Sequence, residues 1–304
     1  MITIFAPAKI NLYLHVGPVR NDGRHPLDSL VVFADQRAAD RLIWSPSEDP
    51  LTFVVDGPQS EKPQNLSDPD NLVLRAARAL EDETGRKFTG DLVLEKHLPI
   101  AAGIGGGSSD AAALLHLFNS AFDLNLSLEK LIDLARPLGG DVPACVAGRP
   151  VLMRGDGDRL ESVSGIPEGF PALMVTPNVE CPTAPVFRRF DEVSCPPSFE
   201  EVSPPEAETR EDWLLELQEG YTNDLASAAI SIVPEIEILL KRLGAFPDIR
   251  HFAMSGSGAT CFGIFDSPED VHKAARSLKS EFPDWCIFET AFGDAQFDLR
   301  KEDA

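Results

Sequence analysis

Apolar and polar residues alternate along the first third of the chain in short runs separated by turn residues. From Leu12 to Val16 every second residue is apolar, which is the period of a β-strand with one buried face. This alternation predicts that Asn11 and His15 share the opposite face and line a cleft. The same reasoning predicts strands at Ile2–Phe5, Leu12–Val16, Leu30–Ala34 and Leu51–Val55.

Helical spacing of apolar residues begins after this region. Between Asn71 and Thr84 apolar residues recur at helical intervals, with Asn71 as the N-cap and Gly85 as the stop. A second apolar helix, Asp110–Phe118, follows a glycine-rich loop and a strand predicted at Asp91–Lys96. Further helices are expected at Leu128–Ala135, Glu235–Leu243 and Val271–Phe282, and further strands at Ala172–Thr176, Phe252–Met254, Thr260–Phe265 and Cys286–Phe292.

The order of these elements favours an α+β fold over a doubly wound parallel sheet, because hairpin-like strand pairs lie beside helices. The length of 304 residues suits two domains. We place them at residues 1–154, which contain the glycine-rich loop, and at residues 155–304.

Charge narrows the range of partners. The chain has 27 Lys and Arg against 49 Asp and Glu, a formal net charge of −22, whereas nucleic acids and anionic membranes attract basic surfaces. No apolar run approaches the roughly 20 residues that cross a bilayer, and the first residues lack a secretory signal pattern. We therefore expect a cytoplasmic protein without nucleic acid or membrane partners. Its cysteines form no CxxC pair and are expected to be free structural thiols: Cys145, Cys181, Cys195, Cys261 and Cys286.

One acidic, proline-rich segment stands apart near residues 192–220. Residues 192–224 hold ten carboxylates and one arginine, and therefore contribute −9 to the net charge. Repulsion between these charges and two Pro-Pro pairs favours an exposed excursion with a short helix around Trp213 to Leu217. A solvated insertion is the simplest interpretation, and a partner-binding or regulatory segment is the alternative.

The stretch from Pro99 to Ser109 is the most informative about chemistry. Four of its 11 residues are glycine, and it opens the apolar helix. Glycine lets the backbone approach a ligand closely, and the N-terminus of a helix favours phosphate. The common nucleotide fingerprints do not fit, because no lysine precedes Ser108 and Leu98–Pro99 separates the loop from its strand. A flexible linker is the alternative, although a linker would not lead into an apolar helix.

Polar residues at two places in the sequence are candidates for chemistry beside such a loop. Lys9 and Asn11 lie two residues apart, on the same side of an otherwise apolar strand. Asp141 follows two glycines between apolar segments. Taken singly, such a lysine extends to water and such an aspartate caps a turn. If the loop holds the phosphates of ATP, Lys9 supplies the cation and Asp141 the base that phosphoryl transfer to an alcohol requires.

Four segments together resemble the signature motifs of the GHMP small-molecule kinases: PAKIN at 7–11, Pro99–Ser109, LGGDVP at 138–143 and SGSGA at 255–259. Others resemble one branch of that family, which acts on a cytidine diphosphate-linked alcohol in isoprenoid precursor synthesis: PAKINLYL, NDGRHPLDSL at 21–30, GDGDRL at 155–160, PTAPVF at 182–187 and TNDL at 222–225. The resemblance implies two domains with mixed and antiparallel sheets covered by helices. It also implies an ATP-dependent phosphotransferase that uses Mg2+.

The resemblance further implies residue roles. Asp141 would be the base toward the substrate hydroxyl, and Lys9 would orient it and temper charge. Ser255–Gly258 would form a second glycine turn that closes over the site, and Ser109 would be a candidate metal contact. The ATP-binding loop would comprise Pro99, Ile100, Ala101, Ala102, Gly103, Ile104, Gly105, Gly106, Gly107, Ser108 and Ser109.

The substrate contacts that the resemblance implies are Asn11, Arg24, His25, Thr183 and Phe187. His25 would read the edge of the cytosine, and Phe187 would stack on it beside Thr183. Arg24 occupies a position where the family often has tyrosine, and a guanidinium can also stack on a base. Asp110 occupies a position where asparagine is frequent, so a carboxylate would lie near the phosphates.

Other functions stay open at this point. The chain could be a GHMP kinase for a different alcohol, which would have no use for the His25 and Phe187 pair. It could also be a catalytically silent nucleotide sensor that reaches a partner through the acidic segment, although Lys9 and Asp141 would then be superfluous. We expect a monomer or a weak homodimer.

Overall fold

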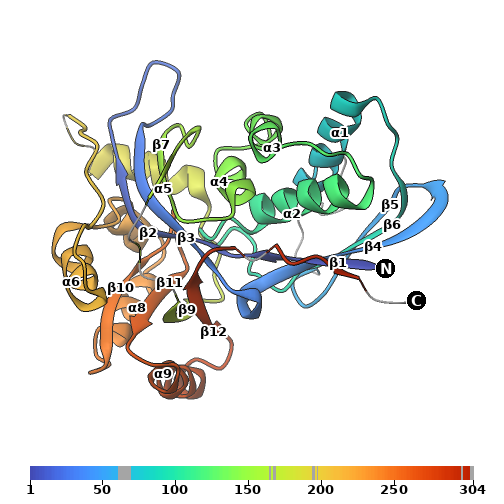
Figure 1. Ribbon diagram of the computed structural model, residues 1–304. Helices are drawn as coiled ribbons and strands as arrows, with labels where there is room; N and C mark the ends of the chain where they lie inside the picture. Colours follow the sequence, from blue (N-terminus) through green and yellow to red (C-terminus); the bar gives the residue numbers. More distant parts are fainter. Residues whose placement is uncertain are drawn as a thin grey trace.

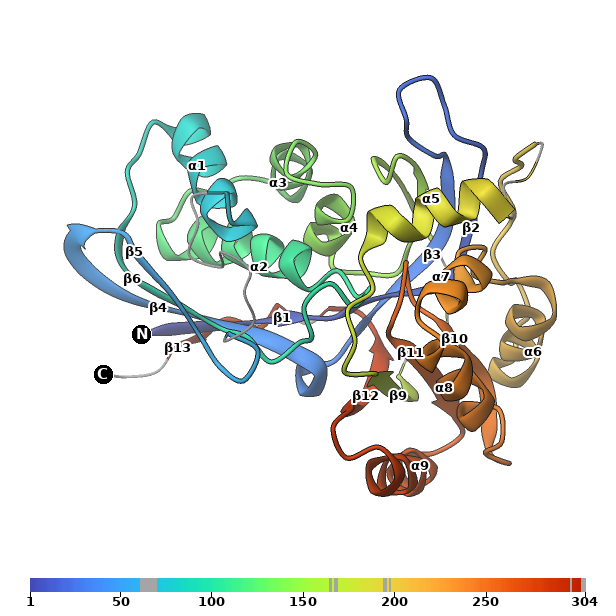
Figure 2. The same ribbon diagram turned by 180° about the vertical axis from the view of Figure 1, so that it is seen from behind.

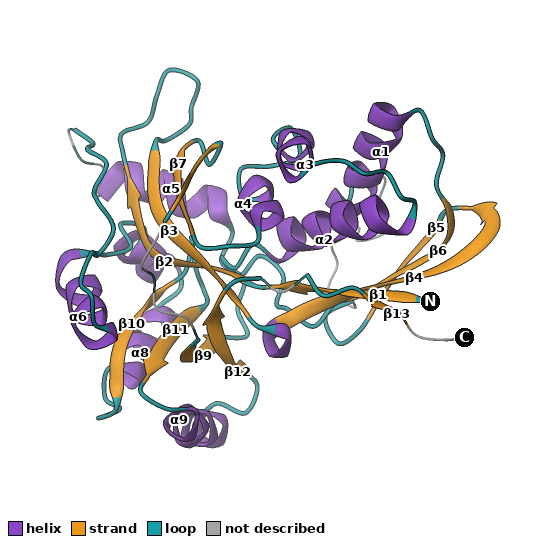
Figure 3. Ribbon diagram, in the orientation of Figure 1, coloured by secondary structure: helices purple, strands orange, loops and turns teal. Residues whose placement is uncertain are grey.

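The computed structural model describes residues 1–60, 70–163, 166, 169–193, 196, 198–295 and 297–301. Within these ranges the strands form two sheets, and helices pack on both (Figure 1, Figure 3). All ladders between the described strands are antiparallel except that between β5 and β6. The predicted α+β class is confirmed.

The first sheet has the order β13 (Arg300–Lys301), β1 (Ile2–Pro7), β4 (Ala39–Pro50), β6 (Thr89–Glu95) and β5 (Thr52–Asp56). A short 3-10 turn, Gln36–Ala38, precedes β4. The helices that gather on one side of this sheet are α1 (Leu72–Thr84), α2 (Gly106–Ala121), α3 (Leu128–Ala135) and α4 (Val142–Ala147) (Figure 1). Together they bury an apolar core centred on α2.

The second sheet has the order β10 (Ile249–Met254), β11 (Cys261–Phe265), β9 (Phe170–Thr176), β12 (Cys286–Gly293), β3 (Leu27–Ala34), β7 (Val151–Gly155) and β8 (Arg159–Ser162), with β2 (Lys9–Val16) paired to β3. Alternate residues of β9 enter different cores: Leu173 and Val175 face one, and Ala172 and Met174 the other. The first core contains α5 (Thr183–Val193), α7 (Ala226–Ile232), α8 (Glu235–Leu243) and α9 (Pro268–Glu281), and the second contains α6 (Arg210–Gly220) (Figure 2).

Every strand and helix predicted from the pattern overlaps an observed element. The caps explain several boundaries: the Asn71 side chain accepts from the Val73 N–H at the start of α1, and the Ser127 side chain accepts from the Lys130 N–H in α3. Gly85 ends α1 in the left-handed region at φ 68°. The prediction missed the short 3-10 turn, β4, α4, β7, β8, α5, α7 and β13.

The predicted pairing of Asn11 with His15 on one face is wrong. The register of β2 against β3 shifts between Asn11 and Tyr13, so the strand contains a β-bulge there. Beyond the bulge the faces exchange, and Leu14 lies on the same side as Asn11. His15 instead lies beside Tyr13, with ring centroids 5.2 Å apart, on the opposite face.

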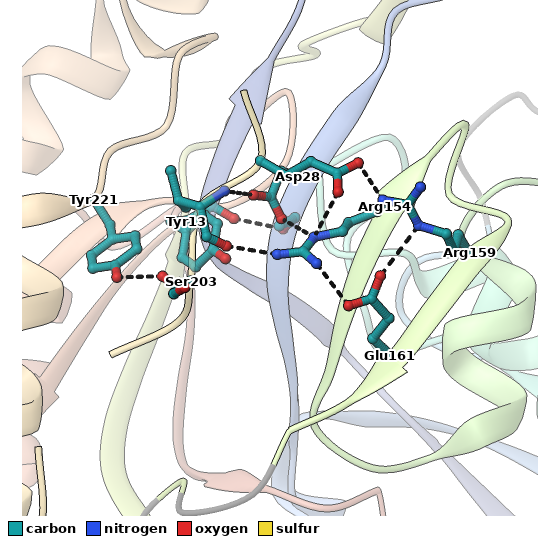
Figure 4. Close-up of polar contacts among 10 residues, drawn as sticks. Tyr13, Asp28, Arg154, Arg159, Glu161, Ser203 and Tyr221 are labelled. Carbon is teal, nitrogen blue, oxygen red and sulfur yellow. Dashed lines mark hydrogen bonds and ion pairs between the residues drawn. The ribbon is translucent and has the colours of Figure 1, made fainter. Parts of the chain in front are cut away.

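The prediction for the acidic segment is confirmed in part: most of its carboxylates are exposed, and α6 contains the predicted short helix, but the segment packs on the protein instead of extending into solvent. Trp213 in α6 is 1% exposed and stacks on Phe170, with ring centroids 5.5 Å apart. The residues before this helix, 198–209, lie against the second sheet, and we call them the acidic strap. The Val202 N–H donates to the Asp28 carboxylate at 2.6 Å, and Arg154 donates to the Val202 carbonyl at 2.6 Å (Figure 4). A buried ion pair therefore holds the strap by its backbone.

The predicted boundary between residues 154 and 155 falls inside the β7–β8 hairpin, and the second sheet takes β2 and β3 from the first half of the chain. The two-domain division stays a prediction. Cys145, Cys181, Cys261 and Cys286 are free thiols, whereas Cys195 lies outside the described residues. No helix within the described ranges combines the length and apolarity that a membrane span requires.

Candidate active site

The glycine-rich loop joins the end of β6 to α2 and lies directly against the start of β2. The Lys9 N–H donates to the Ile104 carbonyl at 2.9 Å, which joins the strand to the loop. Gly105 adopts φ 60°, and a Cβ atom there would lie 3.1 Å from Cε of Lys9. Glycine is therefore required here both by the backbone and by the close approach of Lys9. The N-terminus of α2 begins at Gly106, immediately beyond this contact.

Lys9 and Asp141 meet beside this loop. Nζ of Lys9 lies 3.2 Å from Oδ1 of Asp141 and donates to Oδ1 of Asn11 at 2.8 Å. The Asn11 amide in turn donates to the Ser29 hydroxyl at 2.7 Å. The Lys9 side chain is 3% exposed, whereas that of Asp141 is 36% exposed. The lysine is thus held from within the protein, and the carboxylate can reach a bound molecule.

The second glycine turn, Ser255–Gly258, packs against the first loop. The Ser255 hydroxyl donates to the Gly103 carbonyl at 3.0 Å and accepts the Asn11 backbone N–H at 3.2 Å. The Asn223 amide holds the turn from behind, because it donates to the carbonyls of Met254 at 2.7 Å and Gly256 at 2.8 Å. Hydrogen bonds therefore fix the two glycine segments to each other and to β2.

These segments enclose a cavity of about 710 Å3. This volume falls within the range of small-molecule sites. Lys9, Asn11, Asp141, Thr183 and Phe187 line it, as do ten of the predicted loop residues: Pro99, Ile100, Ala101, Ala102, Gly103, Ile104, Gly105, Gly106, Gly107 and Ser108.

Ser109 differs from that prediction. Its hydroxyl is fully buried and donates to the Pro7 carbonyl at 2.6 Å, so it anchors α2 to β1. This arrangement turns the hydroxyl away from the cavity, and we withdraw Ser109 as a metal contact.

Three buried ionisable residues lie together beside the cavity, and we call them the buried triad: Asp40, Lys96 and Asp110. Lys96 and Asp110 line the cavity. Nζ of Lys96 contacts the Asp40 carboxylate and donates to Oδ2 of Asp110 at 2.8 Å. Asp40 also accepts the backbone N–H groups of His97 at 2.6 Å and Leu98 at 2.8 Å. The triad therefore holds the glycine loop at both ends. Its lysine donates a hydrogen bond to Asp110, the acidic residue that the sequence analysis expected near the phosphates.

Four of the five predicted substrate residues border a second pocket of about 590 Å3: Arg24, His25, Thr183 and Phe187. Asn11 lines only the larger cavity. The His25 and Phe187 rings lie 5.1 Å apart. Thr183 and Phe187 also line the larger cavity, so the two spaces adjoin. Nη1 of Arg24 lies 3.2 Å from the Asp156 carboxylate. The guanidinium therefore pairs with an acid at the pocket rim, and its predicted stacking on a base stays untested.

Sequence reasoning missed several residues that line these two pockets or hold the segments that line them. Asp40 and Lys96 belong to no motif, and only the folded sheet brings them to the loop. Asp156 and Gly157 belong to the GDGDRL segment. A Cβ atom on Gly157 would lie 2.6 Å from the Gly140 carbonyl, so this segment packs against the turn that carries Asp141. Asn223 belongs to the TNDL segment, to which no role had been given.

Comparison with known proteins agrees with this geometry. The model described as the GHMP kinases N terminal domain matches residues 71–149, and that described as GHMP kinases C terminal matches residues 206–284. A 4-diphosphocytidyl-2-C-methyl-D-erythritol kinase of Hyphomonas neptunium is 45% identical over 281 residues, which cover 89% of this chain and 92% of the relative. Its counterpart in Granulibacter bethesdensis is 42% identical, over 93% of this chain and 92% of the relative.

Solved structures of GHMP kinases are also similar to this chain over nearly its whole length. A crystal structure of 4-(cytidine 5'-diphospho)-2C-methyl-D-erythritol kinase is 31% identical, has a TM-score of 0.77, and is matched over 96% of this chain and 99% of its own. A homoserine kinase from Cytophaga hutchinsonii shares the fold at 18% identity, with a TM-score of 0.68, over 98% of this chain and 97% of its own. The chain therefore belongs to the GHMP kinases, among relatives named 4-diphosphocytidyl-2-C-methyl-D-erythritol kinase.

Proposed function

We propose that this protein transfers the γ-phosphate of ATP to the 2-hydroxyl of 4-diphosphocytidyl-2-C-methyl-D-erythritol, a step of the non-mevalonate route to isoprenoid precursors. The observation that carries the proposal is the contact between Lys9 and Asp141, 3.2 Å apart, in a cavity that adjoins the His25 and Phe187 pocket. A phosphate donor in the first space and a cytidine diphosphate in the second would meet at this pair.

The phosphates of ATP would lie along residues 99–108, at the N-terminus of α2. Backbone N–H groups at a helix start favour anions, and this helix is 16 residues long. The close fit at Gly105, where even a Cβ atom would crowd Lys9, supports a loop shaped to bring the phosphates near that ammonium group. Lys9 would then stabilise the negative charge that develops during transfer.

Asp141 would be the general base. It takes the proton from the substrate hydroxyl as that oxygen forms a bond to the γ-phosphorus, while the bond from this phosphorus to the bridging oxygen breaks and leaves its electrons on ADP. Lys9 holds the carboxylate in place, and Asn11 holds Lys9 at 2.8 Å. Thus the reacting groups are oriented before the substrate arrives.

Mg2+ would accompany the nucleotide and neutralise phosphate charge. The described residues contain no cluster of three His, Cys, Asp or Glu side chains that could hold a metal ion. The donors that border the cavity near the loop, the Ser108 hydroxyl and the Asp141 carboxylate, suit an ion bound chiefly through phosphate oxygens.

The cytosine would lie in the second pocket, against the Phe187 ring, with Thr183 beside it and His25 at its edge. Asn11 would contact the substrate near the reacting hydroxyl, since it lines the larger cavity. The cytoplasmic location and the monomeric or weakly dimeric state are part of the same proposal. A nucleotide sensor is the less favoured alternative, because the acidic strap that would reach a partner is fastened to the sheet.

A direct assay tests the proposal. The purified protein with ATP and 4-diphosphocytidyl-2-C-methyl-D-erythritol should form one ADP for each phosphorylated product, detected by mass spectrometry. Homoserine and mevalonate serve as competing alcohols. Turnover of either in place of the cytidine compound would move the protein to another branch of the family.

The Asp141→Asn variant in the same assay tests the role of the pair. We expect kcat to fall by about 100-fold or more, because a general base contributes at least that much, while ATP binding measured by calorimetry changes little. Asp133→Asn, which alters an exposed carboxylate on α3, is the control and should leave both unchanged. Equal losses of ATP binding and rate would indicate a structural role for Asp141.

A further inference from the structure

Helix α5 lines the second pocket with five residues: Thr183, Ala184, Phe187, Arg188 and Asp191. Thr183, Phe187 and Asp191 are spaced four residues apart, so they lie on one face of the helix, and all three line the pocket. The sequence pattern had assigned roles to the first two only. Asp191 has no place in the phosphoryl transfer described above.

The orientation of His25 decides what Asp191 can do. Nδ1 of the ring lies 2.9 Å from the Gly17 carbonyl. A carbonyl oxygen can only accept, so Nδ1 carries the hydrogen, and the neutral ring has its lone pair on Nε2. Nε2 lies 3.5 Å from Oδ1 of Asp191, and the His25 side chain is 6% exposed. In this neutral tautomer the buried ring presents an acceptor to the same place as the carboxylate.

The separation between these two atoms is informative. At 3.5 Å it exceeds the ordinary range of an N–H···O hydrogen bond, so the two side chains do not satisfy each other by a close hydrogen bond. Two acceptors side by side suit a ligand group with two hydrogens to donate. The neighbouring cation Arg24 lies 3.2 Å from the Asp156 carboxylate, which gives it a carboxylate partner other than Asp191.

We infer that Asp191 and Nε2 of His25 together bind the exocyclic amino group of the cytosine and thereby select cytidine over uridine nucleotides. This inference rests on the proposed function, which places the cytosine in this pocket. Cytosine has an amino group where uracil has a carbonyl oxygen. With uracil, two acceptors would face a third, and the buried Nε2 of His25 would be left without a donor, which is costly.

The test compares cytidine and uridine ligands in the wild type and in Asp191→Ala. We expect the ratio of kcat/KM for the cytidine substrate to that for its uridine analogue to fall by about tenfold or more in the variant, which is the effect of losing a hydrogen bond to a charged group. Calorimetric binding of CDP and UDP should show the same loss of discrimination. Asp191→Asn, which keeps one acceptor oxygen, should give an intermediate ratio.

Glu192→Ala is the matched control. It removes the neighbouring carboxylate of α5, which accepts from Arg189 at 2.9 Å, and should leave the ratio unchanged. If Asp191→Ala lowers the values for both bases equally, or if the wild type does not discriminate between CDP and UDP, the inference is overturned. If the wild type prefers CDP but does not phosphorylate the cytidine substrate, the proposed function fails while the inference stands.

Discussion

Asp110 is a residue whose chemistry depends on its neighbours. It is buried beside Asp40, and both carboxylates contact the single ammonium group of Lys96. Burial raises the pKa of Asp110 well above its usual range, the Lys96 charge opposes this shift, and the Asp40 charge adds to it. Two carboxylates and one lysine thus reach neutrality when Asp110 keeps its proton. Protonation avoids an uncompensated negative charge beside the glycine loop.

This residue gives a prediction about pH and stability. Since the folded pKa lies above the unfolded one, the native state holds an extra proton between the two values. The stability that this proton provides is present at low pH and is lost as the pH rises through the folded pKa. Asp110→Asn resembles the protonated acid, so the free energy of unfolding of D110N relative to the wild type should increase as the pH rises. Urea denaturation between about pH 5 and about pH 8 measures this difference.

The Asp110→Asn variant should also bind ATP nearly as well as the wild type. Asp40→Asn is the contrasting variant, because it leaves Lys96 with less opposing charge and should destabilise the fold by about 3 kcal/mol. A pH dependence that is identical in D110N and the wild type would show that Asp110 is ionised in the native state.

Among the elements, the acidic strap depends most on tertiary contacts. The Asp28 carboxylate is fully buried and accepts from Nε of Arg154 at 3.1 Å as well as from the Val202 N–H. The Tyr221 hydroxyl donates to the Ser203 carbonyl at 2.6 Å, and Arg159 contacts Glu201 (Figure 4). The strap is thereby held mainly through its backbone, so its own side chains give little indication of where it packs.

Removal of the Asp28 carboxylate should detach the strap. In Asp28→Ala the Arg154 charge and the Val202 N–H lose their buried partner, and we expect a loss of about 3–5 kcal/mol in the free energy of unfolding. Limited proteolysis should then cut within residues 198–209 at protease concentrations that leave the wild type intact. Glu201→Gln, at the more exposed contact with Arg159, should cost less than about 1 kcal/mol. Equal effects of the two variants would contradict this account.

The strap also shows which elements the sequence could predict. Helices α1 and α3 carry their own caps and apolar spacing, and the glycine loop carries its motif, so local pattern was sufficient for them. The bulge at Asn11 depends on pairing with β3, and the packing of Trp213 depends on Phe170, which is distant in the chain. The candidate site followed the same rule: Lys9 and Asp141 belong to motifs, whereas Asp40 and Lys96 become neighbours only through folding.

For the whole molecule, the net charge of −22 must be reconciled with two highly anionic ligands. Long-range electrostatic attraction would not favour these ligands, so in the proposed site binding would depend on local groups such as Lys9 and the backbone N–H groups at the start of α2. Short-range contacts inside a cavity are screened by salt less than exposed charges are.

This balance predicts a shallow salt dependence. Between about 0.05 M and about 0.5 M NaCl, the KM for ATP at a fixed Mg2+ concentration should change by less than about threefold. Steady-state kinetics measures it, and turnover at each salt concentration with saturating ATP is the control. A steep weakening, as in a protein that attracts phosphates through a basic surface, would mean that groups outside the cavity contribute to binding.

Both sheets join strands that are far apart in the chain: in the second sheet β3 pairs with both β2 and β12, and in the first sheet β1 pairs with β13. During synthesis on the ribosome, β2 emerges early with Lys9, but its sheet cannot be completed until the last strands have left the exit tunnel. Such distant pairings fold late and slowly. The Lys9 strand therefore stays in an incomplete sheet while the residues between β2 and β12 are made, and catalytic competence arises only after β12 has been synthesised.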